Sequence, residues 1–86
     1  MAVTLLEVGA HLSLEMDSSD FERVRAHLRG TFPDYRTRPA GIAKIVEFGG
    51  ARFTFQDDWD DPCFISSSPD GDALLRRVHA ELVRED

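Results

Sequence analysis

The stretch IAKIVEFGGARFTFQ, residues 42–56, sets two strand-like runs on either side of Gly49–Gly50. A glycine pair between two such runs is typical of a two-residue β-hairpin. In such a hairpin the numbers of facing residues sum to about 99, which sets Val46 against Phe53 on one face and Glu47 against Arg52 on the other. Apolar pairs and an ion pair then separate to opposite sides, and this agreement predicts the register.

Residues 3–16, which precede the first helix, are predicted to be extended, because polar and apolar side chains alternate from His11 to Met16. Gly9–Ala10 interrupts the alternation and allows either one long bulged strand or a hairpin of two short strands. We favour one long bulged strand.

Two helices are expected. The first spans about residues 19–30, with either Asp17 or Ser19 as its N-cap and Gly30 as a C-terminal stop. The second begins at Ser68–Pro69, where a serine cap precedes a proline, and continues to about Arg84. Each helix carries an apolar stripe on one side.

Residues 31–41 hold two prolines and show no periodicity, so they are predicted to be a long connection, and residues 63–65 are predicted to be a short strand. The expected fold is an α+β two-layer sandwich of one domain, residues 1–86, with strands and helices in the order β-α-β-β-β-α. A mainly antiparallel four-stranded sheet would carry both helices on one face, because each apolar stripe needs a surface to cover. The other face would be polar enough to meet water.

The composition favours a soluble cytoplasmic protein without a membrane partner. The 86 residues are 42% hydrophobic and 30% charged, and no apolar run approaches the roughly 18 residues that span a bilayer. The N-terminus has neither a basic leader nor a cleavage site, and the single cysteine cannot form an internal disulfide. A formal net charge of -6 disfavours nucleic acid as a partner.

The expected order of a helix, three antiparallel strands and a helix over residues 19–84 resembles the topology of double-stranded-RNA-binding domains. Those domains grip phosphates with basic residues at the start of the second helix. The corresponding stretch here, SSSPDGDALL, is acidic, so the resemblance covers topology alone.

The segment QDDWDDPCF, residues 56–64, gathers four aspartates around the only tryptophan. We expect it to lie at the same end of the sheet as the loop YRTRPAG, because the outer ends of the two hairpin strands are neighbours. Tyrosine, tryptophan and arginine are enriched in binding hot spots, and carboxylates steer basic partners. The expected partner-binding residues are Tyr35, Arg36, Arg38, Asp57, Asp58, Trp59, Asp60 and Asp61.

The sequence therefore predicts a small acidic protein-interaction module, in the manner of an adaptor, inhibitor or immunity protein, with a basic protein as partner. In a plainer interpretation, Arg36 and Arg38 only pair with the aspartates and Trp59 caps the core. Two further hypotheses are a divalent-metal site at Asp57–Asp61 and a structural homodimer formed through an edge strand.

No cofactor motif is present, and catalysis is not expected. Cys63 has four carboxylates nearby in sequence, which disfavour its thiolate. The three histidines form no cluster in the expected fold, so neither a catalytic triad nor a zinc site can be assembled.

Overall fold

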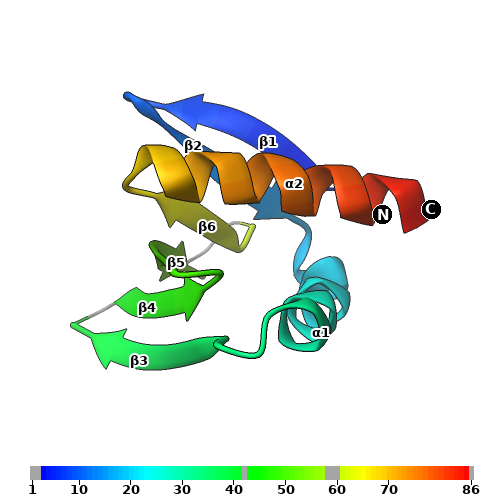
Figure 1. Ribbon diagram of the computed structural model, residues 1–86, viewed down its shortest axis with the longest axis horizontal. Helices are drawn as coiled ribbons and strands as arrows, with labels where there is room; N and C mark the ends of the chain where they lie inside the picture. The colour runs from blue at the N-terminus through cyan, green and yellow to red at the C-terminus, as the bar shows by residue number, and fades with distance from the viewer. Residues whose placement is uncertain (1–2, 42, 58–60, 86) are drawn as a thin grey trace.

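The computed structural model describes residues 3–41, 43–57 and 61–85. Its elements, in chain order, are β1 (Val3–Val8), β2 (His11–Met16), a 3-10 turn (Ser18–Asp20), α1 (Phe21–Thr31), β3 (Arg36–Ala40), β4 (Ala43–Phe48), β5 (Ala51–Gln56), β6 (Cys63–Ser66) and α2 (Pro69–Glu85). The strands form one antiparallel sheet in the order β1-β2-β6-β5-β4-β3 (Figure 1). The α+β class and the antiparallel sheet are as expected from the sequence, whereas the sheet has six strands instead of four.

The central hairpin confirms the predicted register. Val46 faces Phe53, Phe48 faces Ala51, and Glu47 faces Arg52. Gly49 and Gly50 adopt φ angles of 61° and 80°, a left-handed conformation that glycine tolerates best. The turn residues and the alternation of side chains therefore specify the same pairing.

The first extra strand arises because residues 3–16 form a hairpin. Val8 faces His11 across Gly9–Ala10, and Gly9 has a φ of 62°. The favoured prediction of one long bulged strand was wrong, because Gly9 reverses the chain instead of bending it. The structure instead forms the alternative that the sequence left open, a hairpin of two short strands.

The second extra strand is β3, which lies at the edge of the sheet within the segment expected to be a connection. Arg36 pairs with Glu47, and the pairing continues to Ala40 opposite Ala43. Pro39 can occupy this strand because an edge strand does not need every peptide N–H for pairing.

Closely packed aromatic rings form the centre of the core. The ring centroids of Phe48 and Phe53 lie 4.3 Å apart, and those of Phe55 and Phe64 lie 5.0 Å apart. All four side chains come from β4, β5 and β6 and point to the same face of the sheet, which follows from their register.

Both helices pack on that face. In α1, the ring of Phe21 stacks on Phe55, and Phe32, the residue after α1, packs on Phe48. In α2, Leu75, Val78 and Leu82 are fully buried. Neither α1 nor α2 of the described chain covers the opposite face, and we call it the helix-free face.

The helix starts agree in part with the predictions. The Ser68 hydroxyl accepts a hydrogen bond from the Gly71 amide at 3.0 Å, so Ser68 caps α2 as expected. Asp17, one of the two predicted caps, is the N-cap of the 3-10 turn that leads directly into α1, while the N-cap of α1 itself is Asp20, and neither side chain forms a capping hydrogen bond. Among the described residues, no helix has the length and hydrophobicity needed to cross a membrane.

Candidate protein-binding surface

Part of the predicted site falls outside the described residues. Asp58, Trp59 and Asp60 belong to the chain between β5 and β6 that the structure does not describe. Asp57 directly follows β5, and Asp61 lies shortly before β6. The expected roles of the three central residues therefore stay predictions.

Arg36 and Arg38 lie on the helix-free face and share a carboxylate that was not predicted to belong to the site. Arg36 Nε donates a hydrogen bond to Glu47 Oε1 at 2.9 Å, and Arg38 Nε lies 3.9 Å from the same oxygen. Arg52 Nε approaches Glu47 Oε2 at 3.6 Å from the other side. We call these three arginines and Glu47 the arginine cluster.

The cluster is exposed and carries a positive formal charge. The side chains of Arg36, Arg38 and Arg52 are 73%, 53% and 61% exposed, whereas that of Glu47 is 17% exposed. The hydrogen bond from Arg36, together with the charges of the three arginines, holds the pKa of Glu47 below its ordinary value. Glu47 is therefore a carboxylate at neutral pH, and three guanidinium groups surround a single negative charge.

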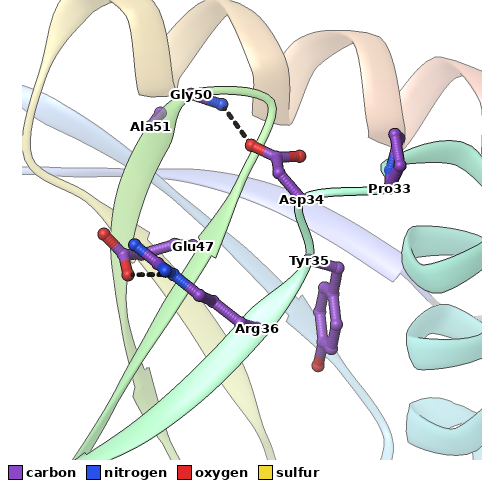
Figure 2. Close-up of a pocket in the computed structure, with 7 residues that line it drawn as sticks. All are labelled: Pro33, Asp34, Tyr35, Arg36, Glu47, Gly50 and Ala51. Carbon is purple, nitrogen blue, oxygen red and sulfur yellow. Dashed lines mark hydrogen bonds and ion pairs between the residues drawn. The ribbon is translucent and has the colours of Figure 1, made fainter.

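Tyr35 faces the other way. Its ring packs against Phe48 on the helix-covered face, with centroids 6.4 Å apart, and Arg29 Cζ lies 5.8 Å from the centre of the Tyr35 ring. Burial raises the pKa of the Tyr35 hydroxyl. Figure 2 shows its ring directed away from Glu47, so Tyr35 supports the strand that carries Arg36 and does not join the arginine cluster.

The sheet separates Arg36 from Asp57. Arg36 lies level with Glu47 and Arg52, while Asp57 follows five residues after Arg52 along β5, or about 16 Å at the usual rise per residue. Arg36 therefore lies away from Asp57, whereas the other end of β3, at Ala40, lies at the end of the sheet from which Asp57 follows β5, as expected for the segment YRTRPAG. The reason is that β3 begins beside the Gly49–Gly50 turn, where Arg36 pairs with Glu47, and runs away from that turn along β4.

A shallow pocket lies beside the arginine cluster at that turn. Its volume is about 560 Å³, and its lining residues are Pro33, Asp34, Tyr35, Arg36, Glu47, Gly50 and Ala51. Asp34 accepts hydrogen bonds from the Gly49 and Gly50 amides, each at 2.9 Å, and the second is drawn in Figure 2. Asp34, which precedes β3, thus holds in place the Gly49–Gly50 turn that forms part of the pocket wall.

An acidic groove lies near the opposite edge of the sheet. Its volume is about 230 Å³, and its lining residues are Thr4, Leu6, Glu15, Met16, Asp17 and Asp61. Three of these six residues are carboxylates, and none is basic. Of the two aspartates of the predicted turn that the structure describes, Asp57 and Asp61, Asp61 lines this groove with Glu15 and Asp17.

The groove is not a metal centre in its described part. Within residues 3–41, 43–57 and 61–85, no three histidine, cysteine, aspartate or glutamate side chains are arranged to hold a metal ion. The hypothesis of a metal site at Asp57–Asp61 depends on Asp58 and Asp60, which lie outside the described residues.

We expect the carboxylate of Asp34 to make a contribution to the free energy of unfolding that depends on pH. The two glycine amide hydrogen bonds hold its pKa below its ordinary value. A lowered folded-state pKa stabilises the protein above the unfolded-state pKa, near pH 4, and this contribution is lost as the pH falls through the folded-state value. Asp34→Asn should therefore lower the urea midpoint at pH 7.

The control for this prediction is the same comparison in acid. At the lowest pH where both proteins still fold, the urea midpoints of the wild type and of Asp34→Asn should converge. An equal difference at both pH values would show that the charge of Asp34 does not act through the turn.

Two members of the arginine cluster, Glu47 and Arg52, were not predicted as site residues. Both were placed on the outer face of the hairpin by the register, so the alternation was the available signal. The missing information was that β3 is a strand, which adds Arg36 and Arg38 to the same face. Comparisons of the chain with protein-family models, with curated proteins and with solved structures found no match.

Proposed function

We propose that the protein is a small protein-interaction module, acting as an adaptor, inhibitor or immunity-like protein in the cytoplasm, and that it has no catalytic activity. The observation that supports this most is the arginine cluster on the helix-free face. Arginine is enriched in binding hot spots, because its planar guanidinium makes several directed hydrogen bonds at once.

The charges favour a partner with a mainly basic surface. The chain has a formal net charge of -6, and Glu15, Asp17 and Asp61 line one groove. Such a distribution attracts a basic protein over the Debye length and speeds its association. The undescribed aspartates, Asp58 and Asp60, would add to this attraction.

The arginine cluster would then act as the anchor. Glu47 already accepts a hydrogen bond from Arg36. The three guanidinium groups nevertheless offer more N–H donors than one carboxylate can accept. The remaining donors suit a carboxylate or backbone carbonyl of the partner. In a complex the lower dielectric would strengthen each of these contacts, which offsets the cost of removing water from the exposed guanidinium groups.

A pull-down with matched variants tests the proposal. Arg36→Ala/Arg52→Ala removes two arginines of the cluster. Arg76→Ala/Arg84→Ala removes two exposed arginines of α2, so both variants change the net charge by the same amount. A partner captured by the wild type should bind the first variant at least about tenfold more weakly and the second almost unchanged.

Glu15→Gln/Asp17→Asn tests the steering role in the same assay. This variant should slow association and reduce its dependence on salt, with a smaller effect on dissociation. If the cluster variant and the α2 variant bound the partner equally well, the arginine cluster would not be the anchor.

A further inference from the structure

Two of the three most exposed large hydrophobic side chains of the described residues, Leu6 and Val8, lie on one edge strand of the sheet. The large hydrophobic residues with the most exposure are Leu6, Val8 and Val83, at 42%, 45% and 50%. Leu6 and Val8 belong to β1, the edge strand opposite β3. Val83 lies one helical turn beyond His79 on α2, and His79 touches β1 through the carbonyl oxygen of Val3.

The two edges of the sheet differ in their protection. Edge strands are usually shielded by charges, prolines or bulges, because unpaired peptide groups attract further strands. β3 carries Arg36, Arg38 and Pro39. β1, with the sequence VTLLEV, has no proline and no basic residue, and Glu7 is its one charge.

The peptide groups of alternate β1 residues point outward. The His79 ring donates from Nε2 to the Val3 carbonyl oxygen at 3.2 Å, so the peptide groups of Val3 face away from β2. In an antiparallel strand the N–H and C=O of every second residue share this direction. Leu5 and Glu7 therefore present their N–H and C=O groups to the open edge.

We propose that a second copy of this chain pairs with β1, antiparallel and about a two-fold axis at Leu6. Leu6 would then face Leu6 of the second copy, Thr4 would face Val8, and Leu5 would exchange hydrogen bonds with Glu7. The outward N–H and C=O groups of Leu5 and Glu7 would be satisfied in both copies. The exposed side chains of Leu6 and Val8 would be covered on the helix-free face.

Of the antiparallel registers in which β1 can pair with β1 of a second copy, the one centred on Leu6 is favoured. A shift by one residue would set the core face of one copy against the helix-free face of the other. Pairing centred on Leu5 would need the Val3 carbonyl, which His79 occupies. Pairing centred on Glu7 would place two like charges directly opposite each other.

This interface is separate from the arginine anchor of the proposed function, although Thr4 and Leu6 also line the acidic groove. β1 and the arginine cluster lie at opposite edges of the sheet. A dimer through β1 would form one twelve-stranded sheet with an arginine cluster near each end. Its absence would therefore leave the arginine anchor intact, and the loss of the anchor would leave the dimer intact.

Sedimentation of the full chain, from about 1 to 300 µM, tests the proposal. The mass should rise from 9.7 kDa for one chain to twice that value. Hydrogen exchange at the high concentration should show new protection of the Leu5 and Glu7 amides. One-chain mass across the whole range would overturn the proposal, and so would a dimer in which both amides exchange freely.

Charge variants at the axis give a second test. Leu6→Lys and Leu6→Glu should each sediment as one chain, because like charges would meet, whereas an equimolar mixture should dimerise. Gln56→Lys is the control, since it adds the same charge to an exposed position on the interior strand β5. If Leu6→Lys dimerised as well as Gln56→Lys, the axis would not lie at Leu6.

Discussion

Phe48→Ala should lower the free energy of unfolding by about 3–5 kcal/mol, the usual cost of removing a buried phenylalanine ring. Phe48 is fully buried. Its ring contacts Phe53 and Phe32, with centroid distances of 4.3 and 5.0 Å, and supports Tyr35 at the start of β3. The substitution would leave a cavity that joins the sheet, α1 and the loop between them.

This loss is large compared with the total free energy of unfolding of a chain of this length. A chain of 86 residues has a free energy of unfolding of roughly 4–13 kcal/mol, so the variant would lose a large share of it. Urea denaturation followed by circular dichroism measures the difference. Val83→Ala is the control, because Val83 is half exposed and should cost less than about 1 kcal/mol. Equal losses in the two variants would contradict the aromatic core.

Gly49→Ala should cost about 2–5 kcal/mol, through two effects that act in the same direction. At a φ of 61°, any side chain is strained by about 1–2 kcal/mol. An added Cβ would also lie 2.9 Å from Leu74 Cδ2 and 3.2 Å from Phe32 Cε1, and relief of such crowding typically costs about 1–3 kcal/mol.

Gly50→Ala separates the two effects. Gly50 has a φ of 80°, but a Cβ there would meet no atom within 4 Å. This variant should lose only the strain energy, about 1–2 kcal/mol. In a Leu74→Ala background, the cost of Gly49→Ala should fall toward that of Gly50→Ala. If Gly49→Ala and Gly50→Ala had the same denaturation midpoint, the close approach of α2 to the turn would be wrong.

The central hairpin could be predicted because several signals agreed. The glycine pair set the turn, and the apolar pairs and Glu47–Arg52 selected one register. Ser68 and Pro69 marked the start of α2 in the same direct way. Where local chemistry and side-chain alternation indicate the same structure, the sequence determines it without knowledge of distant contacts.

The two edges of the sheet could not be predicted in this way. In residues 3–16 the same alternation fits one strand or two, and only the left-handed conformation of Gly9 decides between them. In β3, all five residues are exposed, so the strand has no apolar pattern. Its pairing depends on Glu47, on the Asp34 hydrogen bonds to the turn and on Tyr35 packing under Phe48.

The candidate site was predicted in part for the same reason. Arg36 and Arg38 were selected by residue type and were expected to lie near the aspartate turn, with which they pair in the plainer interpretation. Once β3 pairs with β4, the alternation places both arginines on the helix-free face beside Glu47. The sequence thus identified candidate side chains, while their neighbours depended on the position of an edge strand.

The central claim, that the arginine cluster is where a partner binds, is tested most directly by amide chemical-shift mapping. The isotope-labelled protein would be titrated with a partner captured by the wild type. We expect the largest shifts along the outer positions of β3, β4 and β5, at Arg36, Arg38, Glu47 and Arg52, with little change along α2. Shifts concentrated on α2, with these four residues unchanged, would contradict the claim.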